Sequence, residues 1–188
     1  VQDALYTLCQ GFHTVWEEFG ERAYVFLQKQ HAGEAYIAAR MRSMLSMSPH
    51  AISGAEEKIA AIESADGIRY ADKQKEAIRA ALEQGILILT GGPGTGKTTT
   101  LNAIIRLLKE AGERVFLAAP TGRAAKRMSE LTGEEAKTLH RMLQVDWDEH
   151  DEPVFTRNER NPLECDCLVI HELSMVDSYL FEGVLRAL

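Results

Sequence analysis

The chain has 188 residues, of which 45% are hydrophobic and 26% charged, so it can bury a core in one domain or in a domain plus a helical appendage. Its formal net charge of −7 argues against nucleic-acid binding over the whole surface and confines any such contact to a local patch. No apolar run approaches the roughly 18 residues of a membrane span. Its three cysteines, Cys9, Cys165 and Cys167, fit reduced thiols of a cytoplasmic protein better than a disulfide framework or a zinc site.

Residues 1–66 are predicted to form a helical N-terminal region with little chemistry of its own. Apolar residues at helical spacing predict one helix around 5–19 and a second around 37–45. Between them, residues 24–27 fit either a short strand or a buried helical turn. Ser53 and Glu56 have the spacing of a capping box, which predicts a third helix that ends near Gly67.

Residues 67–188 are predicted to form an α/β domain. Helical patterns cover 72–84, 97–111, 122–131, 138–143 and 178–188, and residues 146–163 fit a loop or a small hairpin. Continuous apolar runs at 86–89, 115–119 and 167–170 are typical of strands covered on both faces. Strands that alternate with helices predict a parallel sheet flanked by helices.

The strongest functional signal is the string Gly-Gly-Pro-Gly-Thr-Gly-Lys-Thr at residues 91–98, between a predicted strand and a predicted helix. Glycines let the backbone fold around a phosphate, and the N–H groups of the loop and helix start bind negative oxygens. Lys97 is predicted to reach the β- and γ-phosphates, and the Thr98 hydroxyl to bind Mg²⁺. The nucleotide-binding residues predicted from this string are Gly92, Pro93, Gly94, Thr95, Gly96, Lys97, Thr98 and Thr99.

A catalytic carboxylate is predicted at the end of the third strand, where His171 and Glu172 follow the apolar run. Ligands of open α/β sheets bind beside the carboxyl ends of strands, so Glu172 is placed to act as general base. His171 is unexpected, because Mg²⁺ prefers oxygen ligands to an imidazole nitrogen. We expect a weakened site, or one impaired for hydrolysis.

Two further segments carry polar groups at helix starts. Residues 121–141 hold five Lys or Arg against three Glu, a local +2 that suits contact with a phosphate backbone, although a solvated helix face fits equally well. Gln74 has one donor and one acceptor group with which to read an adenine edge, although a plain surface glutamine is the commoner case. The residues from 138 to 141 are uninformative by themselves.

Taken in order, these strings resemble the RecD-like superfamily 1 DNA helicases, over about residues 50–188. The resemblance rests on 74–78, 89–99, 119–125, 137–141, 161–163 and on His-Glu-Leu-Ser-Met-Val-Asp at 171–177. It implies a RecA-like motor domain that hydrolyses ATP with Mg²⁺ and moves 5′ to 3′ on single-stranded DNA. By motif position, Gln74 contacts adenine, Lys97 and Thr98 hold phosphate and Mg²⁺, and Glu172 activates water. The resemblance also places the 120–127 and 138–141 segments near DNA. The candidate DNA-contacting residues that it implies are Pro120, Thr121, Arg123, Lys126, Arg127, Thr138 and His140. The family also includes subunits of a recombination nuclease, which are further candidate partners.

The chain departs from that family in two ways. His171 stands where the family usually has Asp, and the later motifs, the second motor domain and the arginines that complete the ATP site are absent. We therefore expect a truncated first motor domain with little activity alone, and a sheet whose open edge leads to a rearranged strand or to self-association. The alternatives are a nucleotide-binding module without hydrolysis, with a structural or regulatory role, and a phosphate-loop ATPase that does not act on DNA.

Overall fold

The computed structural model describes residues 7–8, 11, 13–47, 52–147, 149 and 153–188. Its centre is a three-stranded parallel sheet with the order β4-β3-β7, formed by β3 (Val115–Ala119), β4 (Ala136–Thr138) and β7 (Cys167–Ile170). This confirms the predicted parallel α/β architecture and the strands at 115–119 and 167–170. The three-residue β4 was not predicted.

Helices cover both faces of this sheet because side chains alternate along each strand. Val115 and Leu117 face α5 (Lys97–Glu110) and α6 (Gly122–Thr132), whereas Phe116 and Ala118 face α7 (Leu139–Leu143) and α8 (Ser178–Ala187). On its outer side α5 packs against α3 (Ala55–Asp66) and α4 (Asp72–Glu83). These helices were all predicted to within a few residues.

The register between β3 and β7 is reinforced where the two strands begin. The Arg114 guanidinium donates to both carboxylate oxygens of Asp166 at 3.0 Å, and the Arg114 N–H donates to Oδ2 at 2.8 Å. These bonds lower the pKa of Asp166 to about 2. With the strands aligned there, Ala118 lies opposite Ile170 at their carboxyl ends.

One predicted strand is wrong. Residues 86–89 adopt no strand, and they pair with none of the described strands. The side chain of Ile88 is 73% exposed and that of Leu87 is 36% exposed, so the run is not buried either. An extended segment becomes a strand only when a neighbour satisfies its N–H and C=O groups, and residues 86–89 pair with neither outer edge of the β4-β3-β7 sheet.

The N-terminal region is not purely helical. Residues 14–27 form an antiparallel hairpin of β1 (Thr14–Phe19) and β2 (Arg22–Leu27), so the helix predicted over 5–19 is wrong for 14–19, and the strand alternative for 24–27 is correct. Leu5, Phe12 and Cys9 lie outside the described residues. The Ser53–Glu56 capping box does not form, since Gly54 caps α3 without a side-chain bond; that helix does end at Gly67.

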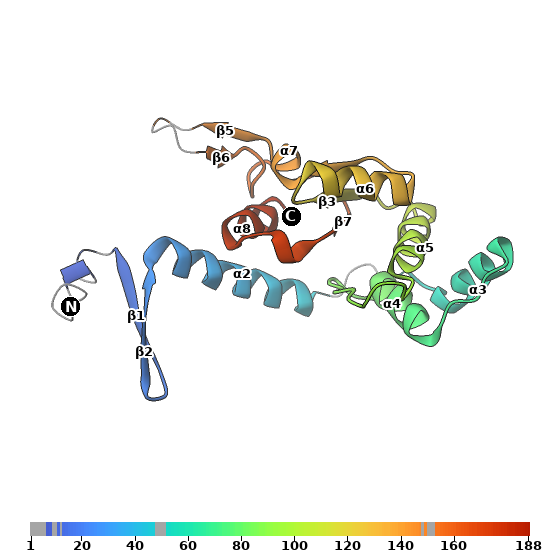
Figure 1. Cartoon of the computed structure of the whole chain (residues 1–188), viewed down its shortest axis with the longest axis horizontal. Helices are drawn as coiled ribbons and strands as arrows, with labels where there is room; N and C mark the ends of the chain where they lie inside the picture. The colour runs from blue at the N-terminus through green and yellow to red at the C-terminus, as the bar shows by residue number, and fades with distance from the viewer. Residues whose placement is uncertain (1–6, 9–10, 12, 48–51, 148, 150–152) are drawn as a thin grey trace.

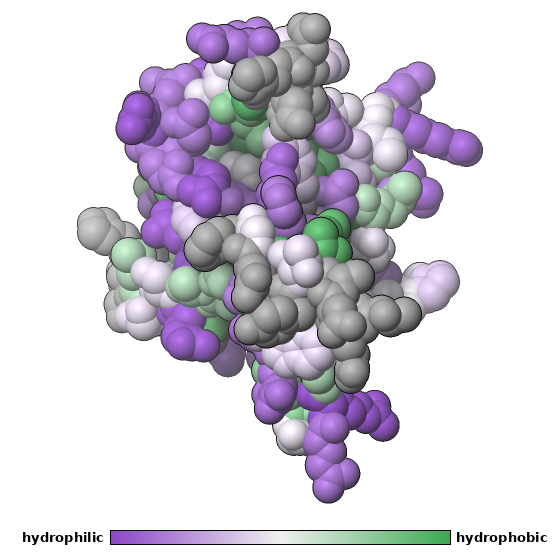
Figure 2. Space-filling view, turned by 90° about the vertical axis from the view of Figure 1, so that its left-hand side faces the viewer, coloured by the Kyte–Doolittle hydropathy of each residue, from purple (hydrophilic) through white to green (hydrophobic). Residues whose placement is uncertain are grey.

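A long helix, α2 (Gln28–Ser46), joins the hairpin to the rest of the chain and packs along α8 (Figure 1). Gly33 is buried there, and the Arg186 guanidinium lies 3.9 Å from the centre of the Tyr36 ring. The solvent-accessible surface of the chain is 12588 Å². This is larger than the surface of about 9,000 Å² expected for a compact chain of the same mass. Seen from the hairpin side, the surface is mostly hydrophilic with small apolar areas between (Figure 2). None of the described helices is long and apolar enough to span a membrane.

Candidate nucleotide and DNA site

The glycine-rich loop enters α5 as a turn that only glycine adopts without strain at two positions. Gly94 and Gly96 have φ values of +74° and +77°, in the left-handed region that L side chains rarely adopt. Thr95 folds its hydroxyl back onto the Gly92 carbonyl at 2.9 Å. The predicted phosphate loop is therefore a compact turn at the start of a 14-residue helix.

Lys97 is folded back over this loop. Its Nζ donates to the carbonyl oxygens of Gly91 at 2.5 Å and Gly92 at 2.7 Å. Carbonyl oxygens are weaker partners for an ammonium group than phosphate oxygens, because the bond then has one charged member instead of two. The amine thus sits at the loop and is able to exchange these carbonyls for a phosphate, which fits the predicted ligand.

The start of α5 adds N–H groups to the same place. The first hydrogen bonds of the helix run to the Gly96 carbonyl from the Thr100 N–H at 2.9 Å and from the Thr100 hydroxyl at 3.0 Å. The N–H groups of residues 97–99 precede this first helical bond and are oriented toward the loop, as at any helix start. Thr98 and Thr99 are exposed, so a hydroxyl oxygen for Mg²⁺ is accessible at Thr98. Thr100 was not among the predicted residues; its side chain is 1% exposed, and its hydroxyl donates to the Gly96 carbonyl.

Gln74 lies against this loop, although it is distant in sequence. Its Nε2 donates to the Gly96 carbonyl at 3.3 Å, and its Oε1 accepts from the Ala71 N–H at 2.9 Å. This contact caps α4, since Asp72 is the first helical residue and Ala71 precedes it. The structure therefore joins Gln74 with the phosphate loop.

A second group of predicted residues meets at the carboxyl edge of the sheet. Ala119, the last residue of β3, lies opposite Thr138, the last residue of β4. Thr121 and Thr138 each cap the following helix, accepting from Ala124 N–H and Arg141 N–H at 3.2 Å. The turn at Pro120 and the start of α7 at His140 are thus neighbours. Both predicted DNA segments belong to one edge.

The basic residues of α6 are exposed at that edge. Arg123, Lys126 and Arg127 are spaced at i, i+3 and i+4, which places them on one face of the helix. Lys126 lies 3.9 Å from Glu130, a loose pair between exposed groups that contributes little. Among the described residues, no ion pair involves Arg123 or Arg127. This face carries positive charge that is available to an anionic ligand.

His171 and Glu172 also follow a strand at this edge. The His171 N–H donates to the Ala118 carbonyl at 2.9 Å, which continues the pairing of β7 with β3 by one residue. Glu172 then turns sharply, with φ +58°, a left-handed conformation that is unusual for a residue with a side chain. Its Oε1 is 4.0 Å from His171 Nε2. Among the described residues, no hydrogen bond or ion pair links Glu172 to Lys97 or Thr98.

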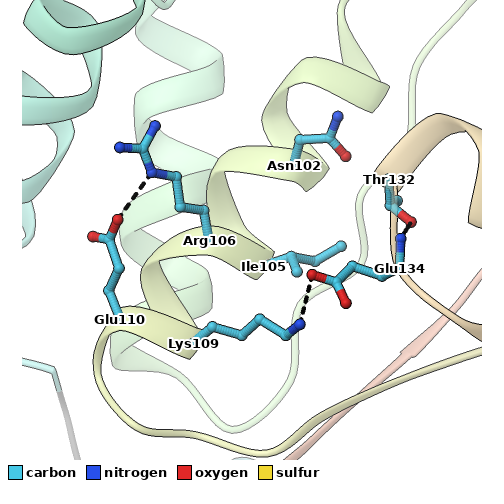
Figure 3. Close-up of a pocket in the computed structure, with 7 residues that line it drawn as sticks. All are labelled: Asn102, Ile105, Arg106, Lys109, Glu110, Thr132 and Glu134. Atoms are coloured by element: carbon cyan, nitrogen blue, oxygen red, sulfur yellow. Dashed lines mark hydrogen bonds and ion pairs between the residues drawn. The ribbon is translucent and has the colours of Figure 1, made fainter.

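The pocket drawn in Figure 3 is separate from both groups. It lies along the later turns of α5 and the end of α6, and its charged side chains neutralise each other: Arg106 pairs with Glu110 and Lys109 with Glu134. The phosphate loop is at the opposite end of α5. This pocket offers no unpaired cation to a phosphate.

Comparison with known proteins agrees with this geometry. A protein family described as "AAA domain" matches residues 74–188. The ATP-dependent RecD2 DNA helicase of Deinococcus radiodurans is 31% identical over 87% of this chain and 22% of its own length. The RecBCD enzyme subunit RecD of Mycolicibacterium smegmatis is 40% identical over 62% of this chain and 25% of its own length. The ATP-dependent DNA helicase dda of Enterobacteria phage T4 is 37% identical over 53% of this chain and 24% of its own length.

This chain thus spans about a quarter of the length of these relatives. The matched residues include the phosphate loop, both segments at the sheet edge and the His171–Glu172 turn. The chain therefore belongs to the AAA domain family, and within it to the RecD-like group of superfamily 1 that its motifs predict.

Proposed function

We propose that this chain is the ATP-binding part of a motor that hydrolyses ATP and moves 5′ to 3′ on single-stranded DNA. The observation that carries the proposal is the loop at 91–96, where two left-handed glycines and the Lys97 amine meet at the start of α5. Backbone N–H groups, a helix dipole and a lysine there together favour a polyphosphate. The names of the relatives, two of which are ATP-dependent DNA helicases, support the same reading.

The proposed roles follow from the chemistry of each group. Residues 92–99 bind the phosphates, with Lys97 on the terminal ones, and Thr98 supplies a hydroxyl oxygen to Mg²⁺. When bound, Mg²⁺ neutralises charge on the phosphate oxygens. Glu172 accepts a proton from the attacking water. Gln74 is the proposed contact to adenine, and one N–H and one lone pair of its amide remain for that contact.

A second candidate function is a nucleotide-binding module that does not hydrolyse. His171 favours it, because this position beside Glu172 presents an imidazole instead of a carboxylate to a hard cation. The two functions differ in whether the bound triphosphate is cleaved, and not in whether it binds.

Exchange of one side chain separates these two functions. We would measure ATP hydrolysis with and without single-stranded DNA for the full-length protein and for its His171→Asp variant, with Glu172→Gln as the inactive control. Activity that appears only in His171→Asp supports the impaired module. Equal, DNA-stimulated activity of the two proteins overturns it. Unchanged activity in Glu172→Gln overturns the assignment of the base.

The exposed face of α6 is the proposed contact with DNA, through Pro120, Thr121, Arg123, Lys126, Arg127, Thr138 and His140. Each phosphate neutralised on a single strand steepens the salt dependence of binding by about 0.7 in log–log slope. Replacement of Arg123, Lys126 and Arg127 by Ala should reduce the slope by up to about 2. The matched control replaces Arg22, Arg69 and Lys73, three exposed cations outside α6. Equal slopes in the two sets would reject the DNA role and leave the phosphate-loop ATPase that acts on something else.

We also propose that this chain associates, either with itself or with other subunits such as those of a recombination nuclease. No described strand pairs with the second edge of β7, and the apolar Leu87 and Ile88 are exposed. An open strand edge and exposed apolar residues favour association. Sedimentation equilibrium from about 1 to 100 μM tests self-association, and a monomer across that range would reject it.

A further inference from the structure

Gln74 bridges two segments of backbone, at Ala71 and at Gly96, that lie 25 residues apart in sequence. Its Oε1 accepts from the Ala71 N–H, and its Nε2 donates to the Gly96 carbonyl. The first bond fixes the side chain to the start of α4, because an N–H at a helix start lacks a partner within the helix. The second therefore holds Gly96 at a set distance from α4.

The Gly96 carbonyl is the point where the phosphate loop becomes a helix. It accepts from the Thr100 N–H, the Thr100 hydroxyl and the Gln74 amide, at 2.9, 3.0 and 3.3 Å. Its orientation is coupled through the peptide plane to the N–H of Lys97. Any shift of this carbonyl thus moves one of the N–H groups that face a phosphate.

Space around Gly96 is filled by the same amide. A Cβ placed on Gly96 would lie 2.4 Å from Gln74 Nε2, closer than any real contact. The amide therefore packs on the loop as well as bonding to it, and the left-handed turn at Gly96 is supported from one side by α4. The partly exposed Gly96 carries this contact, whereas Gly94 has open space around it among the described residues.

We propose that Gln74 is a positioning residue of the phosphate loop, which it orients for a polyphosphate whether or not a base is attached. The inference rests on the proposed nucleotide binding and adds to it. A glutamine that only reads adenine affects ligands that contain adenine. A glutamine that holds Gly96 in place also affects inorganic tripolyphosphate, which has no base.

The test compares ATP with inorganic tripolyphosphate, both with Mg²⁺, by calorimetry on this chain. Gln74→Met keeps the length and helix propensity of the side chain and removes both hydrogen bonds. Gln74→Glu keeps the bond from the Ala71 N–H and removes only the donation to Gly96. The matched control is Lys73→Met on the same turn of α4, whose side chain is 89% exposed and pairs only with Glu76 among the described residues.

We expect tripolyphosphate to bind about three- to tenfold more weakly to Gln74→Met than to the unchanged chain, the range for loss of the one neutral hydrogen bond that reaches the loop, from Gln74 to the Gly96 carbonyl. Gln74→Glu should weaken it too, at a salt concentration of about 0.5 M that screens the added charge. Lys73→Met should bind as the unchanged chain does.

Tripolyphosphate affinity that is unchanged in Gln74→Met, with weaker ATP binding, overturns the inference and leaves Gln74 as a reader of adenine alone. A lower stoichiometry at unchanged affinity also overturns it, because that result indicates partial misfolding. If Gln74→Met does not fold, unchanged tripolyphosphate affinity in Gln74→Glu is decisive. If the unchanged chain binds neither ligand, the proposed nucleotide site itself fails and the role of Gln74 fails with it.

Discussion

Substitution of Gly96 by Ala, compared with the same change at Gly94, measures how strongly α4 supports the phosphate loop. Both glycines are left-handed, with φ +77° and +74°, so Ala costs about 1–2 kcal/mol of stability at either position. Only at Gly96 does the new Cβ meet Gln74 Nε2, at 2.4 Å. The amide must then move and lose its bond to the Gly96 carbonyl, worth about 0.5–1.5 kcal/mol net.

Gly96→Ala is therefore expected to lower the free energy of unfolding by about 1.5–3.5 kcal/mol, the sum of the two costs. Gly94→Ala is expected to lower it by about 1–2 kcal/mol. Urea denaturation of the nucleotide-free chain, followed by circular dichroism, gives both values. In a double-mutant cycle, Gln74→Ala should remove the extra cost of Gly96→Ala and leave the cost of Gly94→Ala unchanged. Equal losses for the two glycine variants, or an extra cost that persists without Gln74, would refute the contact.

Three more predictions concern the fold around the site, each read from urea denaturation. Ile88→Ala should change stability by less than about 0.5 kcal/mol, because Ile88 is exposed. Ile78→Ala should cost about 2–5 kcal/mol, because the side chain of Ile78 is 0% exposed. A large loss in Ile88→Ala would mean that residues 86–89 are buried as the sequence predicted. Gly183→Ala should cost about 1–3 kcal/mol, because its Cβ would lie 2.5 Å from the Phe155 ring, and a neutral result would mean that this ring is free to move. Asp166→Asn should lower stability at pH 7. The pKa of Asp166 is about 2 in the folded chain, below its value in the unfolded chain. The difference in unfolding free energy between the unchanged chain and the variant should therefore be complete above about pH 4 and vanish as the pH falls through 2. A difference that is independent of pH would exclude the charge as its cause.

Helices and strands that are set by neighbouring residues were predicted correctly, whereas an element that depends on a distant partner was not. α5 and α6 begin and end where predicted because Gly96, Thr121 and Gly133 act on adjacent residues. β3 and β7 were predictable because each is an unbroken apolar run between turn residues. β4 was not, since it has only three residues and owes its strand conformation to its pairing with β3.

The strand predicted at residues 86–89 is absent because local preference alone does not make a strand. Four apolar residues before the phosphate loop have strong strand preference, yet a strand also needs a neighbour, and these residues pair with none of the described strands. The hairpin at 14–27 was mistaken for a helix because Trp16 and Phe19, three residues apart, fit a helical period as well as a strand. Short apolar patterns do not separate these two cases.

The residues of the candidate site also fall into two groups, those predicted from a short motif and those brought together by the fold. The phosphate loop, Lys97, Thr98 and the strand that ends at His171 and Glu172 could be predicted from the order of residues alone, because spacing within a short motif decides which chemistry is possible. The bond between Gln74 and Gly96, and the shared sheet edge of Thr121, Thr138 and His171, are visible only in the folded chain. These contacts join residues 17 to 50 positions apart. The free energy that selects them comes from burying apolar side chains between α4 and α5 and on the two faces of the sheet, which no local pattern encodes.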